Sequence, residues 1–173
     1  MKINLLITLF FGTMFINQEP TSQVVNVKVP TGSAKLAKAD ISKLATRKFK
    51  YSEISTQYQN VYSVGDMLIG IKDFRMKAGN EQTLVQKKAE MSAMHKELKL
   101  EDNIDRLEIV KVNGINFLIQ ESHLRGEHNC TFFSETRNNR GVNGSVQFQE
   151  ADSIKGRKIF DELLKSISFK SNL

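Results

Sequence analysis

Apolar and polar residues alternate in several short runs, and this period of two predicts strands. Residues Val24–Val29 alternate and are followed by Pro30, which predicts a first strand that ends there. The run Asp66–Met76 alternates with apolar residues on both faces, so we expect a strand in the centre of a sheet. Between them, Phe49–Tyr62 does not fit a strand period or the expected element boundaries, and we expect irregular chain with one strand at most.

The strongest local signal is a tight hairpin. Two β-prone runs, Leu107–Val112 and Ile115–Gln120, are separated by the two residues Asn113-Gly114. An Asn-Gly pair tolerates the positive φ angles of a type I′ turn, which joins antiparallel strands directly. The sequence therefore predicts an antiparallel pair over these residues.

A second strand pair is predicted over Thr131–Thr136 and Val142–Gln149, with residues 137–141 as its loop. In the later strand, Val146 and Phe148 alternate with polar residues. These polar residues are Ser145, Gln147 and Gln149. We expect the apolar face of this strand to be buried and its polar face to be wet.

Three segments have apolar residues at helical spacing. Residues 34–47, which follow the turn Thr31-Gly32-Ser33, predict a short amphipathic helix, and residues 80–98 predict a long helix capped by Asn80. A final helix is expected to begin at Asp152 or Ser153. The expected buried stripes are Ala37, Ile41, Leu44 and Ala45, then Leu84, Met91, Met94 and Leu98, then Ile159, Phe160, Leu163, Leu164 and Ile167.

The order of these elements predicts an α+β fold, in which a mostly antiparallel sheet has helices on both sides. A chain of 173 residues is long enough for one domain and hardly for two. We expect a signal peptide at residues 1–18, then a lead-in at 19–33 that contains the first strand. Residues 34–173 are expected to form a single α+β domain together with that strand.

Three of these elements together resemble the PsbP-like domains, which include the DcrB-type proteins of the bacterial periplasm. They are the hairpin around Val112–Ile115, the strand Gly144–Phe148 and the closing helix Phe160–Ile167. The resemblance covers about residues 50–170 and rests on element order, with no diagnostic motif. It implies an α/β/α sandwich that binds or assists other proteins, usually without known catalysis, and it supplies no catalytic residues.

The N-terminus is typical of a secretory signal. Lys2 provides a positive charge, and the apolar run Ile3–Ile16 that follows is shorter than the roughly 20 residues of a bilayer span. No small-x-small triplet stands near Asn17 or Gln18, so the cleavage site is poor and an uncleaved anchor is the alternative. We therefore expect a secreted or periplasmic protein that does not span the membrane once the signal is removed.

The net charge of +6 is concentrated in one segment. Six basic residues and a single acidic residue, Asp40, lie between Ala34 and Tyr51. A nucleic-acid interface usually interleaves basic residues with aromatic ones, whereas Phe49 and Tyr51 only follow this segment. We therefore interpret the segment as a solvated helix face and expect no nucleic-acid partner.

His123, His128 and Cys130 form the densest set of chemically reactive side chains in the chain. With Glu121 or Glu127 they could complete a zinc site, but their spacing is unlike that of structural zinc sites. Cys130 could also be a nucleophile with a histidine base, which requires an exposed thiolate. Its neighbours Phe132 and Phe133 instead favour a buried thiol. We expect no metal, no cofactor and no catalytic residue here.

The acidic residues Glu101, Asp102, Asp105 and Glu108 cluster in sequence, but clustering alone does not set the separation that glycoside hydrolysis requires. We interpret them as a solvated connector. The motifs of phosphate-binding loops, dinucleotide-binding folds, serine hydrolases and zinc proteases are all missing from the sequence.

The loop Arg137-Asn138-Asn139-Arg140 is a candidate interaction site, because two guanidinium groups on a hairpin tip can bind an anionic group or a partner. The alternative is an ordinary polar loop.

We conclude from the sequence that the chain is a secreted or periplasmic non-enzymatic domain, active in protein association or envelope maintenance, with a protein as its partner. A small-ligand carrier with a groove between the sheet and the helix 80–98 is the first alternative. A secreted hydrolase or redox enzyme built on Cys130 and the nearby histidines is the second.

Overall fold

The computed structural model describes residues 24–41, 43, 49, 54, 58–76 and 82–170. The expected signal segment at residues 1–18 lies outside the described residues. The same holds for residues 19–23 of the expected lead-in and for residues 42 and 44–47 of the first expected helix.

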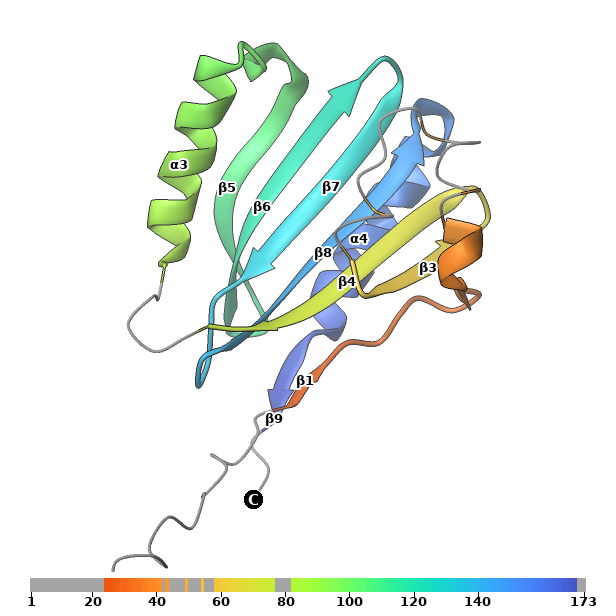
Figure 1. The fold of residues 1–173 in the computed structure, drawn as a ribbon, viewed down its shortest axis with the longest axis horizontal. Coiled ribbons are helices and arrows are strands. Elements are labelled where there is room, and N and C mark those ends of the chain that lie inside the picture. The colour runs from red at the N-terminus through yellow and green to blue at the C-terminus, as the bar shows by residue number, and fades with distance from the viewer. Residues whose placement is uncertain are drawn as a thin grey trace, which may run out of the picture.

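Within this part of the chain, seven strands form one antiparallel sheet in the order β2-β3-β4-β8-β7-β6-β5 (Figure 1). The strands are β2 (Ala34–Lys35), β3 (Asn60–Val64), β4 (Met67–Arg75), β5 (Ile104–Val112), β6 (Ile115–Leu124), β7 (Glu127–Ser134) and β8 (Arg140–Gln149). With helices on both faces, this arrangement confirms the expected α+β class.

The hairpin predicted from Asn113-Gly114 is confirmed. The φ angles of these residues are 50° and 78°, and Val112 pairs with Ile115 across the turn. The next hairpin was not predicted: β6 continues to Leu124, and β7 begins at Glu127. The sequence between Gln120 and Thr131 is mostly polar on both faces, so it lacks the apolar alternation from which strands are identified.

Helix α4 (Ser153–Ser166) packs on the face of the sheet that carries the main core. Apolar side chains of the central strands, among them Phe132 and Phe148, meet the helix stripe there, and the ring centroids of Phe132 and Phe160 lie 6.0 Å apart. The expected stripe is confirmed as buried: Ile159, Phe160, Leu163, Leu164 and Ile167. Burial of this apolar surface is the dominant force that holds the helix on the sheet.

Gly156 lets α4 approach the sheet closely. A Cβ at this position would lie 2.2 Å from Cδ1 of Phe148, a ring that is fully buried. The absence of a side chain at Gly156 is therefore a packing requirement.

Helix α3 (Leu84–Glu97) lies on the opposite face, beside β5 and β6 (Figure 1). Its N-cap is Thr83, which forms a capping box with Gln86, whereas the expected cap Asn80 lies outside the described residues. The expected stripe is wrong in its second half, since Met94 and Leu98 are 46% and 58% exposed. His95 is buried instead.

A smaller apolar cluster covers the other margin of this face, over β3 and β4. Its buried members are Ile41, Phe49, Ile54, Val61 and Leu68. Helix α3 and this cluster therefore stand at opposite sides of the same sheet face, with β7 and β8 between them.

The beginning of the described chain differs from expectation. Ala34–Lys35 form β2 against Tyr62–Ser63, and helical conformation starts only at Lys38. The first strand is also shorter than expected: β1 (Val24–Asn26) pairs antiparallel with β9 (Ser168–Lys170) in a separate two-stranded sheet. Phe169 packs against the main core.

The polar face of β8 is not wet. Ser145 is 1% exposed and Gln147 is 4% exposed, although both point away from α4. Elements distant in sequence cover them, a tertiary effect that the local alternation does not encode.

None of the helices in the described ranges is long and apolar enough to cross a membrane.

We expect Gly156→Ala to lower the free energy of unfolding by about 1–2 kcal/mol, because the clash with Phe148 outweighs the gain in helix propensity. Chemical denaturation measures this difference. Lys158→Ala, on the exposed side of the same helix, serves as the control and should change stability by less than about 0.5 kcal/mol. Equal stability of both variants would show that α4 does not pack closely on the ring of Phe148 at Gly156.

Candidate ligand-binding groove

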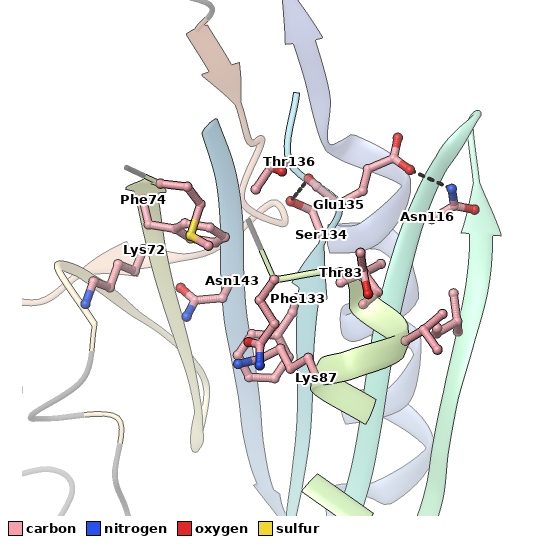
Figure 2. A pocket seen from close by; sticks show the side chains of 15 residues that line it. Lys72, Phe74, Thr83, Lys87, Asn116, Phe133, Ser134, Glu135, Thr136 and Asn143 are labelled. Atoms are coloured by element: carbon pink, nitrogen blue, oxygen red, sulfur yellow. Dashed lines mark hydrogen bonds between the residues drawn. The ribbon is translucent and has the colours of Figure 1, made fainter. Parts of the chain in front are cut away.

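A groove of about 700 Å³ opens between α3 and the sheet (Figure 2). One wall is the first part of α3 with the residues just before it, and the other is the end of β4. Its lining residues are Lys72, Phe74, Met76, Gln82, Thr83, Leu84, Val85, Lys87, Ile109, Asn116, Phe133, Ser134, Glu135, Thr136 and Asn143.

A second hollow of about 190 Å³ continues the groove along the same face. It shares Phe133 and Asn143 with the first and is closed laterally by Met91 and Met94 of α3 on one side and by Ile54 and Tyr58 on the other. The two hollows together follow β7 and β8, between α3 and the smaller apolar cluster.

Strand register places the polar side chains of the floor in rows. Gln120, Thr131 and Ser145 are direct cross-strand neighbours on β6, β7 and β8. One row further, Asn129 lies opposite Gln147. Since side chains of one face recur every second residue, all of these residues point to the α3 side of the sheet.

Only some of the polar side chains on this floor form hydrogen bonds within the described chain. The Ser145 hydroxyl donates a hydrogen bond to Oδ1 of Asn129. Three side-chain oxygens, by contrast, are buried without a hydrogen-bond partner among the groups of the described chain: Gln120 Oε1, Asn143 Oδ1 and Gln147 Oε1. Buried polar atoms are nearly always paired in folded proteins, so a cluster of unpaired oxygens in a hollow marks a candidate binding site.

The groove carries positive charge near Asn143. Lys72 pairs in register with Asn143, and Nζ of Lys87 lies 4.3 Å from the ring centroid of Phe133 (Figure 2). The acidic residue of this region, Glu135, is already engaged: its carboxylate accepts hydrogen bonds from Arg137 at 2.7 Å and from Asn116 at 2.5 Å. Burial alone would raise the pKa of Glu135, but these hydrogen bonds outweigh burial and hold its pKa below the ordinary value.

The predicted cluster of His123, His128 and Cys130 lies on strands β6 and β7, on the opposite, α4 side of the sheet. His128 stacks on Phe148, with ring centroids 5.4 Å apart, and its Nε2 is hydrogen-bonded to Glu150. This bond lowers the pKa of Glu150.

The second histidine of the cluster has its own acidic partner. Nδ1 of His123 lies 2.9 Å from Oδ1 of Asp105, which protrudes where the register of β5 shifts. Each imidazole is thus held by one carboxylate, and no group of three potential metal ligands comes together within the described part of the chain.

Cys130 is 1% exposed and belongs to the core under α4. Burial, with the nearby charge of Glu121 as the next contribution, raises the pKa of its thiol to about 12. Glu121 itself is bound by Arg106 at 2.9 Å and by Arg157 at 3.4 Å. A thiol in this setting stays protonated and inaccessible near neutral pH, which is the opposite of what a nucleophile needs.

In the predicted interaction loop, Arg137 is committed to the fold. Besides Glu135, its guanidinium donates a hydrogen bond to the carbonyl of Gly114 at 2.7 Å and lies 5.4 Å from the ring of Phe169. Asn138 and Asn139 form the turn, with φ angles of 48° and 61°. Arg140 begins β8 and pairs with Arg75 of β4. The role of this loop in binding a partner stays a prediction.

The residues that form the groove floor were missed as a site by the sequence analysis. Gln120, Asn143 and Gln147 looked like ordinary polar positions of half-exposed strands. A usable signal was the recurrence of polar residues at every second position of two adjacent strands, which are Asn129 and Thr131 in β7 and Asn143, Ser145 and Gln147 in β8.

No protein-family model matches the chain, and no curated protein matches it. Among solved structures, it is similar to cyanobacterial PsbP (CyanoP) from Synechocystis sp. PCC 6803, with a TM-score of 0.53 and 10% identity over 87% of this chain and 94% of that one. It is also similar to LpqN of Mycobacterium tuberculosis, a protein involved in cell envelope biogenesis, with a TM-score of 0.53 and 8% identity over 89% and 87% of the two chains. At such identities the likeness shows the fold alone, and it confirms the PsbP-like architecture expected from the sequence.

We expect Cys130 in the folded protein to react with a small disulfide reagent at least about a hundredfold more slowly than in the unfolded chain, since labelling requires opening of the core. The measurement is the rate of labelling near neutral pH with and without denaturant. Rapid labelling of the folded protein would instead support the alternative of a Cys130 enzyme.

The lowered pKa values of Glu135 and Glu150 predict that stability falls in acid. A carboxylate whose folded pKa lies below its unfolded value stabilises the fold above the unfolded value, and this stabilisation is lost as the pH drops through the folded pKa. Glu135→Gln should therefore reduce the loss of unfolding free energy between about pH 5 and about pH 3. Denaturant titrations across this range test it, with the exposed Glu162→Gln as control, and an unchanged slope for Glu135→Gln would contradict the assignment.

Proposed function

We propose that this chain, which has the PsbP-like fold, is a non-enzymatic binding protein that works outside the cytoplasm and holds its ligand in the groove between α3 and the sheet. The observation that carries the proposal is the covered polar face of β6, β7 and β8, where three side-chain oxygens are buried without a partner in the described residues. A surface that only served solubility would leave these groups in water.

The proposal that the protein binds and does not catalyse is supported by the state of its reactive side chains. Cys130 is buried, and His123 and His128 are each held by a carboxylate on the far side of the sheet from the groove. The groove itself offers amides, hydroxyls, two lysines and apolar side chains. Such a set recognises a molecule by hydrogen bonds, charge and apolar contact.

Export is supported by the sequence of residues 1–18, with Lys2 before the apolar run Ile3–Ile16. The involvement of LpqN in cell envelope biogenesis agrees with this location. We infer a role in protein association or envelope maintenance, in which the groove holds a segment of a partner. The small-ligand carrier remains the second candidate, because a hollow of about 700 Å³ is large enough to hold a small molecule.

Native mass spectrometry of the protein purified from its own cells tests this function. We expect a retained molecule on the wild-type protein and its loss in Thr131→Phe, because a ring at this floor position fills the smaller hollow without touching the α4 core. Ser92→Phe, on the exposed side of α3, is the matched control and should retain the molecule. The mass separates a peptide from a small molecule, and equal retention by both variants would place binding outside the groove.

A further inference from the structure

The unpaired oxygens of the groove floor require hydrogen-bond donors. Gln147 is 4% exposed, so water reaches it poorly, yet its Oε1 has no partner within the described ranges. The same holds for Oε1 of Gln120 and Oδ1 of Asn143. The terminal torsion of a carboxamide is soft, so a small rotation turns each of these groups toward a molecule in the groove. The bound molecule must therefore bring N–H or O–H groups.

The spacing of these oxygens favours an extended chain. Asn143 and Gln147 lie four residues apart on β8, which corresponds to about 13 Å along the strand. An extended peptide repeats its N–H groups on one side every second residue, with the same period as the side chains of a strand. A fatty acid has no donors to place along this length, and a single sugar ring is too short to reach both ends.

The two lysines of the groove indicate where one end of the bound molecule lies. Lys72 and Phe133 are the two cross-strand neighbours of Asn143, and Lys87 lies over the ring of Phe133. Neither lysine takes part in the ion pairs found in the described ranges, and Glu135 nearby is neutralised by Arg137. Two ammonium groups that take part in none of these ion pairs lie at the Asn143 end, and they favour a carboxylate there.

Apolar side chains surround this charged end. Phe74 and Met76 border it from β4 and the residue after it, and Leu84 and Val85 border it from α3. Val85 is 68% exposed, which is unusual for a large apolar residue beside a hollow and leaves apolar surface available to a ligand. A carboxylate flanked by apolar surface matches the end of a peptide whose last side chain is apolar.

We propose that the groove binds the C-terminal end of an extended peptide. The terminal carboxylate lies between Lys72 and Lys87, backbone N–H groups reach Asn143 and Gln147, and an apolar last side chain packs among Phe74, Met76 and Leu84. This inference rests on the proposed function of the groove and names the chemistry of its occupant.

The test uses the full chain and a mixture of N-acetylated pentapeptides that end in Leu or Phe, supplied either as free acids or as C-terminal amides. We expect the acids to bind about tenfold more tightly than the amides, because only the acids form charge-assisted hydrogen bonds with the lysines. Fluorescence anisotropy of labelled peptides measures the affinities. In the double variant Lys72→Met and Lys87→Met the difference should vanish, whereas Lys96→Met, on the exposed side of α3, should preserve it.

A second variant separates binding from folding. Gln147→Leu replaces a buried unpaired oxygen by an apolar group of similar size, so we expect a higher melting temperature together with at least about tenfold weaker peptide binding. A residue with a purely structural role would not combine these two changes. Lower stability of Gln147→Leu would show that the carboxamide is paired within the protein and would overturn the inference.

The remaining outcomes distinguish this inference from the function on which it rests. Equal binding of acids and amides excludes recognition of the C-terminus. Binding of sodium laurate or maltotriose, but of no peptide, with loss in Thr131→Phe, would leave the groove as the site and refute a peptide occupant. If no probe binds and the protein from its own cells carries no retained molecule, both the inference and the proposed function fail.

Discussion

The two-residue period of β8 is the constraint on which the structure depends. Val142, Val146 and Phe148 point to one side and form a core with α4, so Asn143 and Gln147 must point to the other. An apolar helix cannot pack directly on such a polar layer without burying polar groups that lack partners. Helix α3 accordingly lies beside the layer, over β5 and β6, and the groove is the space that this arrangement leaves.

Predictions from the sequence were correct where residues close together in the chain determine the local structure. The Asn113-Gly114 turn and the stripe of α4 depend on neighbours in sequence, and both were correct. The cap of α3 shows that one residue can decide where a helix begins. Asn80 and Thr83 are both good capping residues, and only Thr83 has a Gln three positions later to complete a capping box.

The site itself was not predictable in the same way. Ser145 and Gln147 are polar, and their alternation with Val146 and Phe148 suggested exposure to water. Their burial depends on Met91 and Met94 of α3 and on Ile54 and Tyr58, all of which lie more than fifty residues away in sequence. The residues that attracted attention as reactive, His128 and Cys130, are instead parts of packed or ion-paired structure. The residue types typical of catalysis therefore lie on the α4 face of the sheet, and the candidate binding residues lie on its α3 face.

The pairing of β1 with β9 has a mechanical consequence. Val24 lies beside Lys170 in antiparallel register, so the chain enters and leaves the described structure at adjacent points (Figure 1). Tension applied through residues before Val24 opens this short ribbon one hydrogen-bonded pair at a time, which requires far less force than shearing long strands past one another. The ribbon therefore yields before the seven-stranded sheet when the N-terminal segment is pulled away from the C-terminal one.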